Sequence, residues 1–315
     1  MMDKFSNIIS ENKLMLLRMY EESRKQMLSY MLDAAMKGND VKHLRAVRNH
    51  LDDEIIKLKK QFKIYSTDVQ AQTYSAGIKE QEAAYRQLKI AYEPVMATSF
   101  NAYSGLHKEA IKTLAINTYK PLNKVTEIVG RDCIEFVERT NFKSTQDIFL
   151  KLSKFYPDSE RLREMGLKYS RDVVVGSRSW QQGMRDFQKD FAKNGIFKVP
   201  YYTKSGDLHA LVNVRDYASL VARTTTAETY RRGAQNSILE TFDGNDLVQI
   251  IGISEFPNSP CVPYQGRILS LTGKTEGYTT LDEAESNGLF HVNCIHHFAV
   301  TLDVINEYER KNIDY

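Results

Sequence analysis

The chain has 315 residues, of which 42% are hydrophobic and 26% are charged, and its formal net charge is +3. This is the composition of an ordinary globular protein with enough apolar residues for a sizeable core. The nearly balanced charge argues against a surface given over entirely to nucleic-acid binding, although a local basic stripe would fit. Three cysteines are too few for a disulfide framework.

The N-terminus carries no apolar segment of the kind found in a signal peptide. No stretch reaches the ~20 apolar residues that a membrane-spanning helix needs. We therefore expect a protein that is intracellular when made and has no membrane segment. Cys133 stands alone on a helix-like stretch, and we interpret it as a buried small hydrophobe rather than a reactive thiol.

Residues 1–190 are expected to be helical, because proline and glycine are sparse there. Between residues 40 and 65, apolar side chains recur every three or four positions and share one helical face. They are Val41, Leu44, Val47, Leu51, Ile55, Leu58 and Phe62. Packing inside a helical bundle and a coiled-coil contact with another subunit would both explain this face, and we favour the bundle.

Further helices are expected in the same half of the chain. Residues 66–92 are rich in helix formers, and Pro94 would end or kink that helix. Ser144 begins a segment that resembles a capped helix start. A break at Tyr156 precedes another helix, expected over residues 160–169.

Beyond residue 194 the sequence changes to turn residues and strand formers. Two β-type runs flank a turn signal at residues 204–207, which predicts a β-hairpin. A long helix is expected over residues 214–239. Strands are expected over residues 247–253, 267–271 and 298–302. A short helix is expected over residues 281–287, and Gly288 would stop it.

These elements predict an α+β protein in two main parts. The first, residues 1–190, would be an elongated helical region that makes assembly contacts. The second, residues 191–305, would be a small α+β domain with a Cys/His metal site. Residues 306–315 are highly charged and are expected to be a helix end or tail.

The candidate metal site lies near the C-terminus, where two of the three cysteines and three of the seven histidines fall within residues 261–297. Prolines at 257, 260 and 263 stiffen the loop around the first cysteine. Thiolate and imidazole are the usual ligands of zinc. The predicted ligands are Cys261, His291, Cys294 and His296, with His297 as the alternative to His296.

Two interpretations of this cluster remain open from spacing alone. These residues could be polar core residues around a turn, with no metal. They could also hold a zinc ion, and four protein ligands would make that site closed, structural and non-catalytic.

The ordered motifs resemble a known family. Cys-x-Pro-Tyr-Gln-Gly-Arg from Cys261, Ser-Leu-Thr-Gly from Ser270 and Gly-Leu-Phe-His-x-Asn-Cys-x-His from Gly288 are similar to the C-terminal signature of the second minor capsid protein family of tailed phages, which is related to the Mu F-like head morphogenesis proteins. The similarity covers roughly residues 165–300. The chain departs from the family pattern where Val292 and Ile295 replace a proline and an arginine.

The resemblance implies a structural or morphogenetic protein of the phage head, non-enzymatic and present in the virion at low copy. Assembly would take place near the portal in the cytoplasm of the bacterial host. The implied partners are the portal protein and the major capsid protein or other head proteins, with packaged double-stranded DNA as a further candidate.

Four arginines are candidates for that DNA contact, because guanidinium groups bind phosphate well. They are Arg215, Arg223, Arg231 and Arg232. The alternative, which we favour, is a solvated helix face with an ion pair between Glu228 and Arg232. In that case Arg223 would instead be a buried residue that holds the helix on the metal loop.

The sequence also offers two enzymatic alternatives. A metal-dependent nuclease would use His291 or His296 as a base on metal-bound water, but four protein ligands would remove the open position it needs. A mono-ADP-ribosyltransferase would use the Glu-x-Glu motif that ends at Glu285. Only 13 residues separate Ser270 from Glu283, too few for the strands of that fold, and we disfavour this effector activity.

Overall fold

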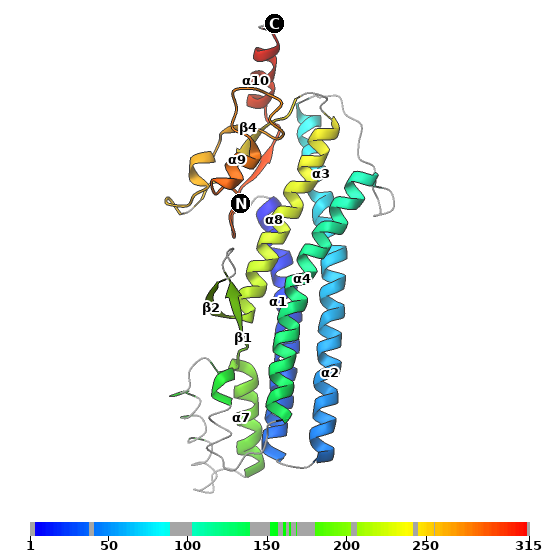
Figure 1. Ribbon diagram of the computed structural model, residues 1–315, viewed down its shortest axis with the longest axis vertical. Coiled ribbons are helices and arrows are strands. Elements are labelled where there is room, and N and C mark those ends of the chain that lie inside the picture. The colour runs from blue at the N-terminus through cyan, green and yellow to red at the C-terminus, as the bar shows by residue number, and fades with distance from the viewer. Residues whose placement is uncertain are drawn as a thin grey trace. The chain divides into compact units, whose positions relative to one another are not determined.

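The computed structural model has a mostly helical N-terminal region followed by a mixed α/β part, as the sequence predicts (Figure 1). Its helical elements are α1 (Lys4–Lys37), α2 (Val41–Ile64), α3 (Gln70–Gln87), α4 (Gly105–Glu138) and α7 (Trp180–Asn194). The structure describes residues 4–37, 41–88, 103–138, 152–156, 160–161, 164, 168, 180–202, 207–241, 245–254 and 256–313.

The predicted apolar face of residues 40–65 is confirmed in α2. Val47, Leu51, Leu58 and Phe62 are buried there. Val41, in contrast, is 69% exposed, so the buried face begins after the first turn. A π-helical turn (Tyr65–Val69) joins α2 to α3 and accounts for the start of the helix predicted over residues 66–92.

Several predicted features lie outside the described residues. These are Pro94, the cap at Ser144, most of the helix at 160–169 and the turn at 204–206. Cys133 lies within α4 and is fully buried. Burial raises the pKa of its thiol well above the usual value, and the interpretation as a small core residue is confirmed.

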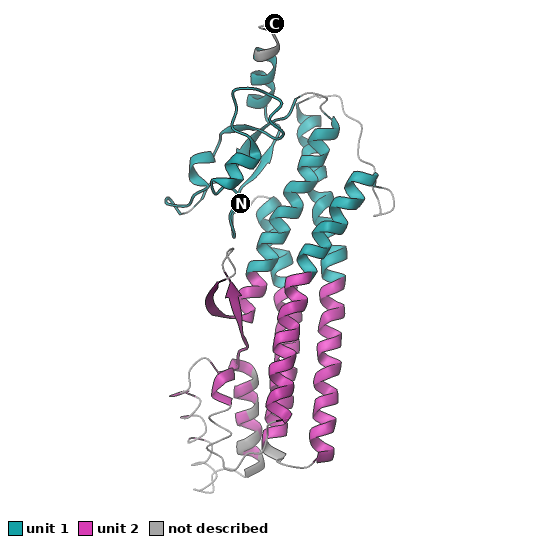
Figure 2. Ribbon diagram, in the orientation of Figure 1, with its two compact units in different colours: residues 1–14, 64–119, 220–315 teal, residues 15–63, 120–219 magenta. Residues whose placement is uncertain are grey.

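The described chain divides into two compact units (Figure 2). One unit comprises residues 1–14, 64–119 and 220–315, and the other comprises residues 15–63 and 120–219. We refer to them as unit 1 and unit 2. The helices α1, α4 and α8 (Val214–Thr241) each contribute residues to both units. None of the helices in the described ranges combines the length and the apolar composition required to span a bilayer.

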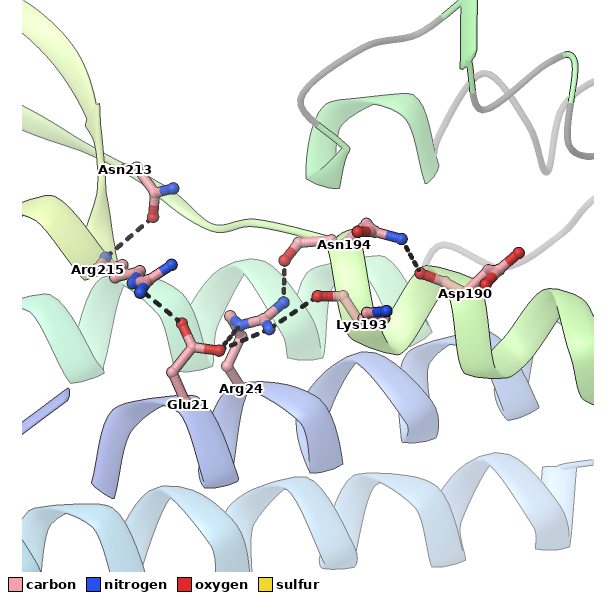
Figure 3. Close-up of polar contacts among 8 residues, drawn as sticks. Glu21, Arg24, Asp190, Lys193, Asn194, Asn213 and Arg215 are labelled. Atoms are coloured by element: carbon pink, nitrogen blue, oxygen red, sulfur yellow. Dashed lines mark hydrogen bonds and ion pairs between the residues drawn. The ribbon is translucent and has the colours of Figure 1, made fainter. Parts of the chain in front are cut away.

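Unit 2 contains the predicted hairpin. Strands β1 (Lys198–Tyr202) and β2 (Leu208–Asn213) pair antiparallel, with Lys198 opposite Asn213. The carbonyl groups at the end of α7 receive hydrogen bonds from Arg24, a residue of α1 that is only 5% exposed (Figure 3). Because the last carbonyls of a helix lack partners within it, this guanidinium group acts as the cap of α7.

Unit 1 contains a three-stranded antiparallel sheet in the order β4-β3-β5. The central strand β3 (Leu247–Ile251) pairs with β4 (Ile268–Ser270) and with β5 (His297–Ala299). The short helix α9 (Leu281–Ser286) is capped by the Thr280 hydroxyl, which accepts from the amide of Glu283. The helix α10 (Leu302–Ile313) follows β5.

The core of this part of unit 1 joins the sheet to the long helices. Ala234 and Ile238 of α8 and Tyr85 of α3 pack with the buried residues of β3, β4 and β5. Burial of such apolar side chains is the main stabilising contribution to a small sheet of this kind. The sheet therefore has a helical support on which the neighbouring loops are held.

A buried carboxylate organises the loop after β4. Asp246 is 2% exposed, and its carboxylate accepts hydrogen bonds from the hydroxyls of Ser270 (2.6 Å) and Thr275 (2.7 Å). It also accepts from the amides of Thr272 (2.9 Å) and Lys274 (3.2 Å). Burial alone would raise the pKa of Asp246, but these hydrogen bonds outweigh it and hold the pKa well below its usual range.

Candidate metal centre

Three of the predicted ligands form one buried group. The sulfur atoms of Cys261 and Cys294 and a ring nitrogen of His296 all lie within 4.8 Å of one another. Cys294 Sγ and His296 Nδ1 are 3.2 Å apart. Cys261 directly precedes a 3-10 turn (Val262–Tyr264), whereas Cys294 and His296 lie on the segment that enters β5. We call these three residues the Cys/His group.

Tight backbone geometry brings the two segments together. Gly288 has a φ of +103°, and a Cβ there would lie 2.5 Å from Cβ of Pro260, so only glycine fits. Phe290 and Asn293 also have positive φ values, of 56° and 69°. Such values are uncommon outside glycine, and they turn the chain sharply before Cys294.

His291 lies at the edge of the Cys/His group. Its Nε2 is 3.2 Å from Cys261 Sγ and 2.8 Å from the hydroxyl of Ser259. Its Nδ1 lies 2.7 Å from the carbonyl oxygen of Val292. Because a carbonyl can only accept, Nδ1 must carry the hydrogen, which leaves the Nε2 lone pair facing Cys261. This arrangement suits a metal ligand, whose second nitrogen usually donates to a carbonyl or carboxylate.

His297 lies elsewhere. Its ring centroid is 4.7 Å from that of Phe5 and 6.3 Å from that of Tyr230. Its Nε2 is 3.8 Å from a carboxylate oxygen of Glu80. Successive residues of a strand face opposite sides. His297 is the first residue of β5 and His296 directly precedes it, so their side chains point in different directions. The group of ligand atoms includes His296 and not His297.

Burial disfavours the charged forms of the side chains in the Cys/His group. Burial raises the pKa of the Cys294 thiol to about 11 and lowers the pKa of His296. Nε2 of His296 is buried and makes no hydrogen bond within the described residues. A buried polar atom without a partner is uncommon. Two sulfurs and one imidazole, with a second imidazole at the edge, match the ligand preferences of zinc.

Arg231 links this group to α8. Its Nη1 donates to the carbonyl oxygen of His296 (3.1 Å), and its guanidinium carbon lies 4.1 Å from the centroid of the Phe290 ring. Burial lowers its pKa to about 10, which leaves it charged at neutral pH. From the sequence, Arg223 was the candidate for holding the helix on the loop with the predicted metal ligands. In the structure, Arg231 makes a contact of this kind.

The other predicted cations have different surroundings. Arg215 is exposed, with its Nε 3.9 Å from Glu21 Oε1 (Figure 3). Arg232 donates to Gln235 (2.8 Å), and no ion pair joins it to Glu228 in the part of the chain that the structure describes. Arg215 belongs to unit 2, whereas the other three arginines belong to unit 1. Nucleic-acid binding by these residues stays a prediction.

Sequence reasoning missed two residues with clear roles. Ser259 hydrogen-bonds His291 and lies 3.2 Å from Cys261 Sγ, so it supports both side chains. Asp246 accepts hydrogen bonds from the hydroxyls of Ser270 and Thr272. In the structure these hydroxyls hold a loop. Neither role has a sequence signal, because each depends on contacts between separate segments.

The C-terminal half of the chain matches a known family. Residues 163–314 match the family described as phage minor capsid protein 2. This match confirms the resemblance and covers the Cys/His group, the sheet and α8. No curated protein and no solved structure matches the chain. Residues 163–314 are thus similar to the phage minor capsid protein 2 family, and the match does not extend over helices α1 to α4.

Proposed function

We propose that the chain is a structural minor capsid protein in the head of a tailed bacteriophage or prophage, acting near the portal during head assembly. The observation that carries the proposal is the match of residues 163–314 to phage minor capsid protein 2. The partners in this proposal are the portal protein and the major capsid protein or other head proteins. Residues 1–190 would supply assembly contacts, residues 191–305 the α+β domain and residues 306–315 a charged tail.

The proposed role is not enzymatic. Zinc would be held by Cys261, Cys294 and His296, with His291 as the fourth ligand. The burial of the Cys/His group and the orientation of His291 support a closed site. When bound, such an ion contributes free energy of folding. The residues themselves would join the 3-10 turn after Cys261 to the start of β5.

Contact with packaged double-stranded DNA is a further part of the proposal. Arg215 and Arg232 have exposed side chains and are available to phosphate. Phosphate contacts position a protein on DNA without reading its sequence. A low-copy head protein near the portal would need contacts of this kind only.

Particle composition tests the proposed role. Purified phage particles should contain the protein at low copy relative to the major capsid protein, and cross-linking should join it to the portal. Quantitative mass spectrometry of particles and of the infected-cell lysate measures both. A protein that is abundant in lysate and absent from particles would refute the assignment to the head.

Metal content tests the zinc site separately. The purified protein should carry about one zinc per chain, measured by elemental analysis. Cys294→Ser and His296→Ala should lose the metal, whereas the matched control His297→Ala should keep it. A metal-free wild-type protein would reject the zinc site and leave the head assignment standing.

A further inference from the structure

The Cys/His group brings two thiols together from separate segments of unit 1. The sulfur atoms of Cys261 and Cys294 lie within 4.8 Å of each other. A disulfide bond requires a sulfur–sulfur distance of about 2.0 Å. Both cysteines lie in turns rather than in a helix or strand, so side-chain rotation and a small shift of either loop would close this gap.

The two sulfurs are buried beneath loops that solvent reaches. Cys261 is 1% exposed and Cys294 is 6% exposed. The residues just ahead of them are open, however: residues 256–258 and Pro260 are exposed before Cys261, and residues 292 and 293 are exposed before Cys294. A molecule as small as hydrogen peroxide would therefore reach the thiols through a local opening of either loop.

Oxidation of this pair should be slow. Burial and, in smaller part, the neighbouring Cys261 raise the pKa of the Cys294 thiol to about 11. The thiolate is the reactive form of cysteine, and little of it is present at neutral pH. Such a pair is unsuited to fast redox sensing and suits a protein whose surroundings change once.

We propose that Cys261 and Cys294 form an oxidative modification site, at which hydrogen peroxide converts the two thiols into an intramolecular disulfide. Both S–H bonds and the O–O bond break, and one S–S bond forms. The peroxide accepts two electrons and the two thiol hydrogens and leaves as two molecules of water. The disulfide occupies both sulfurs, so a zinc ion bound between them would be released.

The consequence of this modification rests on the proposed function, although its chemistry does not. A head protein would be made in the reducing cytoplasm of the host and would leave the cell inside the particle, in oxidising surroundings. Zinc would join the two loops in the first environment and a disulfide would join them in the second. The 3-10 turn after Cys261 and the start of β5 would then stay linked in both.

Peptide mapping of the full-length protein tests the modification. Protein treated with a chelator and then with hydrogen peroxide is alkylated, digested without reduction and analysed by mass spectrometry. We expect a cross-linked peptide pair that contains Cys261 and Cys294, and its loss after addition of a thiol reductant. Cys133 is the internal reference and should stay a free thiol, because it is fully buried within α4. Free thiols at both positions, sulfonic acids without a cross-link, or a cross-link between two chains would overturn the proposal.

Melting temperatures test whether the disulfide stabilises the fold. Chelator-treated wild type should melt at a higher temperature after oxidation than before it, because a cross-link restricts the unfolded chain. Cys261→Ser and Cys294→Ser should show no such gain, whereas the matched control Cys133→Ser should show it. An oxidised wild type that melts no higher than the reduced protein would overturn the proposed linking role.

Zinc loading separates this proposal from the zinc site. Zinc-loaded protein should oxidise more slowly than chelator-treated protein and should release its ion, which a chromophoric indicator measures. A cross-link that forms equally fast with and without zinc would support the disulfide and reject the zinc site. Zinc binding by a protein that never forms the cross-link would overturn the disulfide and keep the zinc site. These measurements use no particles, so their outcome is independent of the assignment to the phage head.

Discussion

Gly77 of α3 and Gly233 of α8 allow the two helices to touch through their backbones. A Cβ at Gly77 would lie well under 3.0 Å from the carbonyl oxygen of Tyr230, and a Cβ at Gly233 equally close to that of Tyr74. The relationship is reciprocal. Gly77 faces Tyr230, three positions before Gly233, and Gly233 faces Tyr74, three positions before Gly77. Real Cβ atoms essentially never approach backbone this closely, so the helices would have to separate to admit any side chain.

Gly77→Ala should therefore destabilise the protein. Alanine favours the helix by about 1 kcal/mol over glycine, but overpacking against rigid backbone costs up to about 3 kcal/mol. We expect a net loss of about 2 kcal/mol in the free energy of unfolding, measured by chemical denaturation. Gly105→Ala is the control, because nothing lies within 4 Å of its Cβ position. A stabilised Gly77→Ala variant would contradict the close approach.

The cap of α7 predicts the effect of losing Arg24. This side chain donates to the carbonyl oxygens of Gly195 and Lys193 and to Glu21. Arg24→Met keeps the length of the side chain but leaves these acceptors unpaired, which should cost about 3 kcal/mol. Chemical denaturation measures the loss. Arg18→Met, at an exposed position of the same helix, should stay within about 0.5 kcal/mol of wild type.

Asp246 predicts a pH-dependent contribution to stability. Its pKa is lower in the folded protein than in the unfolded chain, where it is about 3.9. The stabilisation is therefore complete above about pH 4 and is lost as the pH falls towards the folded pKa. Asp246→Asn should cost about 2 kcal/mol or more near neutral pH, and the difference from wild type should shrink in acid.

Denaturation curves at neutral and acidic pH check this sign. Asp282→Asn serves as the comparison, because Asp282 is exposed in the first turn of α9. It should show little change at either pH. A difference between wild type and Asp246→Asn that grows in acid would contradict the role given to the hydrogen bonds of Asp246.

The proposed zinc ion predicts sensitivity to chelators and to pH. A strong chelator should lower the melting temperature of the wild type, because bound metal contributes to folding. Zinc binding must displace protons from thiols, and burial raises the pKa of Cys294 to about 11 in the metal-free state. Zinc affinity should therefore fall as the pH is lowered. Competition with a chromophoric chelator across a pH series measures it.

Cys261→Ser provides the control for the chelator experiment. This variant lacks one proposed ligand and should melt at the same temperature with and without the chelator. If the chelator shifted the melting of Cys261→Ser as much as that of the wild type, the stabilising ion would have to be bound at another site.

Features that depend on local periodicity could be predicted from the sequence. The buried face of α2 follows from apolar spacings of three and four, and the hairpin of β1 and β2 from two β-type runs around a turn. Gly288 stops α9 because a left-handed backbone conformation is needed there. In each case the deciding signal lies within a few residues of the element.

Features that depend on tertiary contacts could be predicted only in outline. Spacing identified the ligand candidates but left His296 and His297 as alternatives, because the choice depends on which way each side chain leaves the segment around β5. The residue that holds the metal loop on α8 is Arg231 rather than Arg223, eight positions away. Asp246 carries no motif, since its partners lie 24 to 29 residues further along the chain.

The strand order β4-β3-β5 has a consequence for biosynthesis. The central strand β3 is translated first of the three, and its second neighbour is complete only at Ala299. Until then, one edge of β3 has no neighbouring strand. Cys261 is also translated before Cys294 and His296, which lie just ahead of β5. A ribosome stalled before this point would carry a nascent chain with an open sheet edge and a free thiol, both of which invite contact with other chains. The Cys/His group and the sheet can therefore be completed only after residues 294–299 have been translated.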